Sequence, residues 1–135
     1  MTDRELIEKK LARVESCLRE LRTLIRPEEI LSDLRAERFA QHTLQIAIQA
    51  ALDVASHIIS DERLGEPRTN RELFEILAEN GWLSRQRVSP LRQMVGFRNI
   101  LVHGYASVDD RIVWGVIEIH LAPLRKAVTQ LLATP

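Results

Sequence analysis

The chain has 135 residues with 19 basic and 19 acidic side chains, so its formal net charge is zero. That length suffices for one domain whose hydrophobic core needs neither disulfides nor metals, and the zero charge excludes a uniformly basic surface for nucleic acid. There is no signal peptide, and no apolar run is long enough to span a membrane, so we expect a single soluble, cytoplasmic domain over residues 1–135.

The first apolar pattern lies near the N-terminus. Apolar residues recur at alternating steps of four and three from Ile7 to Ile25, which predicts a helix over residues 3–25 with one apolar seam. Arg26-Pro27 ends this helix, because proline disfavours helical geometry in the residue before it. The one cysteine, Cys17, lies within the pattern, so we expect a half-buried small hydrophobic side chain and not a reactive thiol.

A second helix is predicted over residues 27–60, with Pro27 in its first turn. Its second half, LQIAIQAALDVASHII, is apolar nearly all round, which is typical of a helix at the centre of a bundle. Polar residues interrupt it at steps of four and form one stripe, made of Gln45, Gln49, Asp53 and His57. The stripe is either a set of core polar groups that satisfy one another or the wall of a polar cleft or subunit interface.

The segment DERLGEPRTN predicts a loop, followed by a short helix that Thr69 or Asn70 caps and that ends near Asn80-Gly81. A fourth helix is expected to begin between Ser84 and Pro90, with Ser89-Pro90 as cap and first position, and to end at Gly104. After a turn, apolar periodicity predicts a fifth helix over residues 112–132. With no strand pattern, the predicted fold class is all-α, a five-helix up-and-down bundle.

The end of the fourth helix reads GFRNILVHGY and is the part of the sequence richest in potential chemistry. Asn99 and His103 are four residues apart, so they share a helix face and the amide can orient the imidazole. Arg98 and His103 are five apart and diverge by roughly 140°. Either the helix unwinds near Gly104, or the full site takes its residues from two chains of a two-fold dimer.

An arginine and a histidine without a carboxylate cluster suit the cleavage of RNA. The guanidinium binds a phosphate and stabilises developing charge, while the imidazole transfers a proton during attack of the ribose 2′-hydroxyl. Asp53 and His57 could hold one edge of a metal, but no third ligand has suitable spacing, so no metal site is predicted. The alternative is purely structural, since a histidine near a helix C-terminus interacts favourably with the helix dipole.

Arg98, a four-residue gap, His103, one residue and Tyr105 together resemble the signature of the HEPN superfamily of small helical ribonucleases. The order of three segments along the chain also resembles the HepT branch of this superfamily, and this resemblance covers nearly the whole chain. The segments are LQIAIQAALDVASHII, a proline-containing loop and MVGFRNILVHGY. The resemblance implies a HEPN-like homodimer whose signature residues line a cleft at the subunit interface.

The resemblance also implies a function. HepT proteins are metal-independent RNA endonuclease toxins of type VII-like toxin–antitoxin systems, neutralised by a minimal (MNT-type) nucleotidyltransferase antitoxin. By this resemblance Arg98 would engage the scissile phosphate, His103 would act as general acid or base, and Tyr105 would be the residue that the antitoxin AMPylates. The added phosphate would place negative charge and bulk where RNA phosphates bind.

The remaining positions are assigned more loosely. Asn99 matches the family's Arg-Asn pair and would orient His103 or bind RNA, while Asp53 and His57 match the central-helix pattern and are predicted to support the cleft. Gly104 departs from the acidic residue common in the family. No cofactor is implied, and both tRNA and mRNA stay open as substrates. Two other functions stay open: a non-catalytic helical partner that binds nucleotide or substrate for a nucleotidyltransferase, and a plain dimerisation bundle.

Overall fold

The structure is a computed structural model that describes residues 4–24, 26, 28–29 and 32–103, with the backbone alone for residues 100–103. This part of the chain contains the helices α1 (Arg4–Thr23), α2 (Leu34–Asp61), α3 (Asn70–Glu79) and α4 (Val88–His103). A 3₁₀ turn, η2 (Arg85–Arg87), leads into α4. The prediction of an all-α fold is confirmed for these residues, while the fifth helix predicted over residues 112–132 lies outside them.

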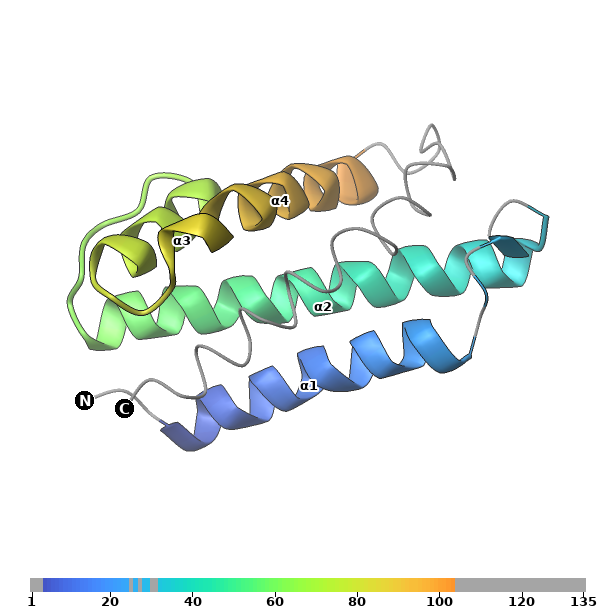
Figure 1. Cartoon of the computed structure of the whole chain (residues 1–135), viewed down its shortest axis with the longest axis horizontal. Coiled ribbons are helices and arrows are strands. Elements are labelled where there is room, and N and C mark those ends of the chain that lie inside the picture. Colours follow the sequence, from blue (N-terminus) through green and yellow to red (C-terminus); the bar gives the residue numbers. More distant parts are fainter. Residues whose placement is uncertain (1–3, 25, 27, 30–31, 104–135) are drawn as a thin grey trace.

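Helices α1 and α2 lie antiparallel, side by side along most of their length (Figure 1). The described part of the seam predicted for α1 is buried and faces this partner; its members are Ile7, Leu11, Val14, Leu18 and Leu21, while Ile25 lies outside the described residues. Cys17 extends the same face and is also buried. The alternation of four- and three-residue steps therefore forms one continuous contact with α2.

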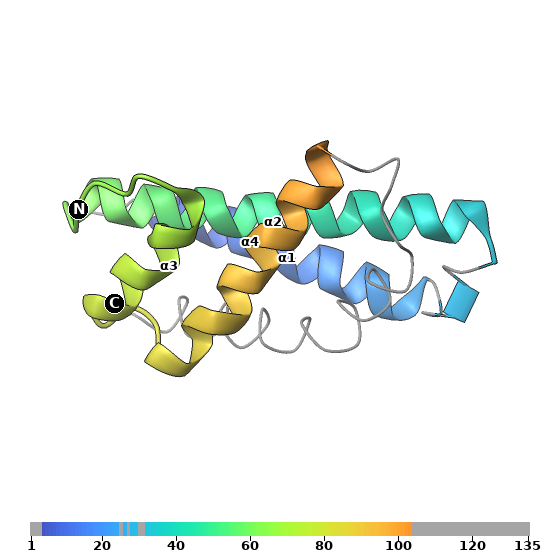
Figure 2. The same cartoon turned by 90° about the horizontal axis from the view of Figure 1, so that it is seen from above.

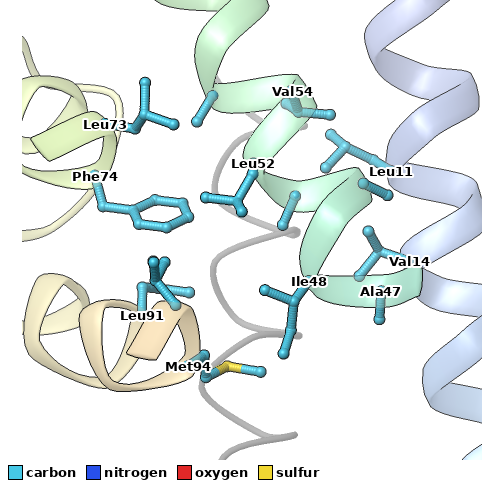
Figure 3. Close-up of a cluster of buried hydrophobic side chains, with 14 of the residues drawn as sticks. Leu11, Val14, Ala47, Ile48, Leu52, Val54, Leu73, Phe74, Leu91 and Met94 are labelled. Carbon is cyan, nitrogen blue, oxygen red and sulfur yellow. The ribbon is translucent and has the colours of Figure 1, made fainter. Parts of the chain in front are cut away.

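Helix α2 is the centre of the bundle, as its nearly uniform apolar composition predicted. Figure 3 shows Leu11 and Val14 of α1 on one side of it and Phe74 and Met94, from α3 and α4, on the other. Several α2 positions between these layers are alanine, and small side chains let neighbouring helices approach closely. A helix covered on two sides buries much of its surface, so a polar side chain on a covered face of α2 needs a specific partner.

Helices α3 and α4 cross α2 obliquely and do not run along it (Figure 2). Within the described residues, only α1 and α2 thus form the up-and-down pair that the sequence predicted for the whole bundle. The oblique crossing places the C-terminal half of α4 over the middle of α2 (Figure 2). This crossing brings the motif at the end of α4 to the polar stripe of α2.

The predicted start of α2 at Pro27 was wrong, since the helix begins at Leu34. Asp33 has extended backbone geometry, and its side chain accepts a hydrogen bond from the Arg35 amide at 2.9 Å. Side-chain capping of this kind satisfies an amide that has no partner inside the helix. A turn precedes it, in which the amides of Ser32 and Asp33 both donate to the Glu29 carbonyl.

The start and end of α3 were predicted correctly, with Thr69 at the N-cap and Gly81 just beyond the end. The Thr69 side chain makes no capping hydrogen bond; instead the Glu72 carboxylate accepts from the Arg68 amide at 2.6 Å. Gly81 has φ +80, a left-handed conformation that side chains disfavour.

Helix α4 begins at Val88, within the predicted window, but Ser89 and Pro90 are not its cap and first position. Both lie inside the first turn, where a proline removes no intrahelical hydrogen bond. Pro90 therefore does not shorten α4. None of the helices in the described residues has the length and apolar character that crossing a membrane requires.

Candidate functional site

Arg98 lies on α4, half-buried, with its side chain directed at α2. Its Nη2 donates a short hydrogen bond to Oε1 of Gln49, which is 49 residues earlier in the chain. Nε is buried and has no partner among the residues that the structure describes. A guanidinium carries five N–H donors, and the bond to Gln49 holds Arg98 at its Nη2 end.

The contact continues from α4 across α2 to α1. Gln49 Nε2 donates to Asp53 Oδ1 at 2.9 Å, and Asp53 Oδ2 lies 3.6 Å from Lys10 Nζ. A carboxylate only accepts hydrogen bonds and a guanidinium only donates them, so the Gln49 amide between them acts as acceptor toward Arg98 and as donor toward Asp53. Gln49 and Asp53 thus fulfil the first interpretation of the polar stripe, in which its members satisfy one another.

The second interpretation of the stripe, a polar cleft, also holds for part of it. A cavity of about 530 Å³ lies along α1 and α2, with Arg98 of α4 in its wall. Its charged lining residues are Lys9, Lys10, Arg13, Asp53 and Arg98. The other lining residues are Leu6, His42, Gln45, Ile46, Gln49 and Ala50. Four basic residues against one acidic residue make this the kind of site that attracts an anion.

His57 lies apart from this cavity and forms a separate local pair. Its Nε2 is 2.9 Å from Asp61 Oδ2, one helical turn away on α2. The approach is close but lacks the angles of a hydrogen bond, so it is an ion-pair contact when the imidazole is protonated. Of the two residues that matched the central-helix pattern, Asp53 is linked to Arg98 through Gln49. His57 lies outside this group.

The histidine and tyrosine of the motif are placed only in part. His103 is the last residue of α4, with its backbone described, while Gly104 and Tyr105 lie outside the described residues. Asn99 is exposed and lies beside Arg98 on α4. Because α4 is a regular helix as far as His103, the predicted divergence of roughly 140° between Arg98 and His103 applies to their backbone positions.

Two further observations bear on the chemistry. Across the described residues, no three His, Cys, Asp or Glu side chains lie together in a group that could hold a metal ion. Burial raises the pKa of the Cys17 thiol, and the nearby Glu20 carboxylate raises it further against a smaller opposing effect of Arg13. Cys17 is therefore a core residue, more deeply buried than the half-buried side chain that was predicted, and its raised pKa keeps the thiol protonated and unreactive, as expected.

Sequence reasoning missed the contributions of α1 and the specific role of Gln49. The spacing of the stripe identified Gln49 as polar within an apolar helix, but nothing in the sequence indicated Arg98 as its partner. Lys10 and Arg13 read as ordinary solvated charges on an amphipathic helix. Their one sequence signal is that both flank the buried seam, which places them beside α2.

The described residues thus form an all-α helical bundle in which Arg98 lies in the wall of a cavity lined mainly by basic side chains. The chain matches the family described as "Ribonuclease HepT-like" over residues 7–131. The chain belongs to this family, and the predicted relation to the HepT branch of the HEPN superfamily is confirmed.

Three similar proteins are particularly informative. An mRNA nuclease HepT of Shewanella oneidensis is 30% identical over 118 residues, which are 87% of this chain and 89% of the relative. A tRNA nuclease HepT of Aphanizomenon flos-aquae is 31% identical over 94 residues, which are 70% of this chain and 64% of that relative. The solved structure of a tri-AMPylated S. oneidensis HEPN toxin in complex with MNT antitoxin matches with a TM-score of 0.88 and 28% identity. That match covers 99% of this chain and 100% of the toxin.

Proposed function

We propose that this chain is an RNA endonuclease toxin of a two-component system whose antitoxin is an MNT-type nucleotidyltransferase. The observation that carries the proposal is the family match over residues 7–131, which includes all three motif positions, Arg98, His103 and Tyr105. The two relatives named as nucleases act on mRNA and on tRNA. They favour a nuclease over the non-catalytic partner subunit and over the plain dimerisation bundle.

The proposed reaction uses a phosphate-binding group and a proton-transfer group, with no metal ion. The ribose 2′-hydroxyl loses its proton to an imidazole and attacks the adjacent phosphorus, and the bond from phosphorus to the 5′-oxygen breaks. The leaving 5′-oxygen takes up a proton, so the products are a 2′,3′-cyclic phosphate and a 5′-hydroxyl. His103 supplies the proton transfer, and Arg98 binds the non-bridging phosphate oxygens on which charge develops.

The position of Arg98 supports this role. An arginine that binds a phosphate in a transition state contributes most when its orientation is set before the substrate arrives. Gln49 sets that orientation through Nη2 and occupies one of the five N–H donors of the guanidinium. Asp53 acts one step further away, since it holds the Gln49 amide.

We further propose that the complete site is formed by a homodimer. Arg98 and His103 are on one regular helix and their backbone positions diverge, so we do not expect a single helix to direct both side chains at one small group. A two-fold axis near the ends of two α4 helices would let the arginine of each chain work with the histidine of its partner. Asn99, exposed on α4, would then orient an imidazole or bind RNA at the same cleft.

Tyr105 is proposed as the residue to which the antitoxin attaches AMP. It follows His103 by two positions, so a phosphodiester on its oxygen would bring negative charge close to the proposed catalytic groups. Such a charge repels RNA phosphates and offers Arg98 a competing partner.

The test is incubation of the purified chain with total RNA in the presence of EDTA. We expect cleavage with 5′-hydroxyl ends by the wild type, and loss of cleavage in Arg98→Ala and His103→Ala. Arg92→Ala is the matched control, because Arg92 is also an arginine on α4 but is exposed and contacts Glu75 at 3.8 Å. Cleavage that persists in both motif variants, or that fails equally in Arg92→Ala, contradicts the assignment.

The antitoxin step has its own measurement. The chain is incubated with the partner nucleotidyltransferase and ATP, and the mass of the peptide containing Tyr105 is followed together with RNA cleavage. We expect added AMP on this peptide and parallel loss of cleavage, with neither change in Tyr105→Phe. Inhibition of Tyr105→Phe by the partner and ATP would show that another residue is modified.

A further inference from the structure

The cavity beside Arg98 carries a positive charge that the chain as a whole lacks. Its lining holds four basic residues and one acidic residue, whereas the full chain has 19 of each. Three of the four basic residues come from a single helix, α1: Lys9, Lys10 and Arg13. Like charges gathered around one hollow repel one another, and a bound anion relieves that repulsion.

The α1 cations are available to such an anion. Within the part of the chain that the structure describes, Lys9 is paired with Glu5 alone, at 3.7 Å, and both side chains are more than 70% exposed, so water screens this contact strongly. Arg13 has no ion pair with any residue in the described part of the chain. Lys10 is held in place by Asp53, whose carboxylate is shared between Lys10 and Gln49.

The remaining lining indicates more than a free inorganic anion. Leu6, Ile46 and Ala50 contribute apolar surface, and Gln45 adds an amide that can pair with a hydroxyl or a base edge. A volume of about 530 Å³ falls within the range of roughly 300–1,000 Å³ typical of sites for small organic ligands. Apolar surface beside clustered cations suits a nucleotide unit, with its sugar or base on the apolar part and its phosphates on the cations.

We infer that this cavity binds the RNA strand one nucleotide away from the cleaved bond. This inference rests on the proposed function. Gln49 contacts Arg98 and Asp53 contacts Lys10, and these two α2 residues are four positions apart, about 6 Å along the helix. One nucleotide of an extended strand spans such a step. With the scissile phosphate on Arg98, the neighbouring phosphate lies against α1.

Among the described residues, no Phe, Tyr or Trp lines the cavity, so this part of the subsite lacks the stacking surface with which many proteins bind single strands. Binding is therefore carried by phosphate contacts, and it is strongly dependent on salt and nearly independent of base sequence. The subsite adds affinity and sets the register of the strand, while base selection must come from elsewhere in the molecule.

The test measures RNA affinity in the full-length His103→Ala protein, in which cleavage is blocked. A fluorescent single-stranded RNA oligonucleotide is titrated at a series of NaCl concentrations, with and without the double substitution Lys9→Gln/Arg13→Gln. We expect the slope of log affinity against log salt to fall by about 0.7, the contribution of the one phosphate that the subsite neutralises. At about 0.1 M NaCl this slope corresponds to roughly 5-fold weaker binding.

The matched control is Arg19→Gln/Arg22→Gln, which removes the same charge from exposed positions on the same helix that do not line the cavity. It should leave both slope and affinity nearly unchanged. Equal loss in the two double variants would overturn the inference, because only total charge would then matter. Unchanged RNA binding in Lys9→Gln/Arg13→Gln would also overturn the inference. This holds even if the substitutions slow AMP transfer by the partner, because the cavity would then bind a free nucleotide and not the RNA strand.

Failure of the inference is distinguishable from failure of the proposed function. If the wild type cleaves RNA but the cavity variant binds RNA normally, only the subsite is wrong. If the wild type neither cleaves nor binds RNA, both are wrong. Thermal unfolding of each variant confirms that the exposed substitutions leave the fold intact.

Discussion

Gln49 determines the direction in which Arg98 points. Its amide nitrogen is engaged by Asp53, so its amide oxygen is the atom that faces the guanidinium. A carboxylate at this position would neutralise Arg98 and compete with a phosphate, whereas an apolar side chain would provide no acceptor. A neutral side chain with both a donor and an acceptor serves a phosphate-binding arginine without competing for its charge.

The substitution Gln49→Leu tests this positioning role. We expect kcat/KM for RNA cleavage to fall about 10- to 100-fold, because a hydrogen bond to a charged group contributes about 1.5–3 kcal/mol. The pH profile should keep its shape, since the titrating imidazole is unchanged. Gln41→Leu is the matched control, since Gln41 is on the same helix, contacts Glu37 at 3.5 Å and does not line the cavity. Equal losses in both variants, or a shifted pH profile, would contradict the role of Gln49.

Cys17 provides a prediction about pH. Burial raises its thiol pKa above the ordinary value of 9.0, so the folded state binds the thiol proton more tightly than the unfolded state does. The resulting stabilisation is complete below pH 9 and is lost as the pH rises from the unfolded pKa to the raised folded one. Chemical denaturation of wild type and Cys17→Ala should show a stability difference that narrows only above this pH. A difference in stability that stays constant with pH would show that folding does not shift the pKa of the Cys17 thiol.

At the scale of the helices, two glycines differ in whether the backbone conformation requires glycine. Gly81 ends the α3 segment with φ +80 and has open space around it, so its requirement is conformational. Gly96 lies inside α4, and an added Cβ would meet only the end of the Arg71 side chain, at 3.2 Å. A flexible side chain can move by a few tenths of an ångström, so the cost of glycine in a helix dominates at this second position.

We therefore expect Gly81→Ala to destabilise the fold by about 1–2 kcal/mol, the cost of a left-handed conformation in a residue with a Cβ. Gly96→Ala should stabilise it by about 0.5–1 kcal/mol through helix propensity. Urea denaturation measures both, and Gly81→Asn serves as the control because asparagine tolerates left-handed geometry better. Destabilisation by Gly96→Ala would show that Arg71 cannot move away.

At the scale of the whole molecule, the oblique crossing of α4 over α2 is the feature that assembles the site. It joins three helices through one chain of side chains: Lys10, Asp53, Gln49 and Arg98. The same crossing leaves the end of α4 beyond the α1–α2 pair (Figure 2). An end that extends from the bundle in this way can meet a second copy of itself, as the proposed dimer requires.

Mixed dimers test that arrangement. Arg98→Ala and His103→Ala chains carrying different affinity tags are co-expressed, and the heterodimer is purified through both tags. If each site takes its arginine from one chain and its histidine from the other, the heterodimer keeps one intact site and about half of the wild-type activity. The two parent homodimers should both be inactive. An inactive heterodimer would place both residues of each site on a single chain.

Much of the fold follows from local patterns in the sequence. The seam of α1, the central position of α2 and the ends of α3 are set by apolar periodicity and by residues with particular backbone preferences, such as Gly81. The start of α2 was the main error, because Pro27 is compatible with a first turn while the Asp33 cap depends on a single side-chain contact. Several polar residues can cap a helix, and only the folded chain selects among them.

The candidate site divides in a similar way. The motif residues Arg98, His103 and Tyr105 are close in sequence, so their spacing and the family they resemble could be recognised without coordinates. Which residues surround Arg98 was decided by tertiary structure, since Gln49 is 49 positions away and the cations of the cavity are on α1. Periodicity predicts which face of each helix is buried, but the angle at which two buried faces cross depends on the packing of both. That angle decides which polar side chains meet. Here it brings Arg98 into contact with Gln49, whose amide is held by Asp53.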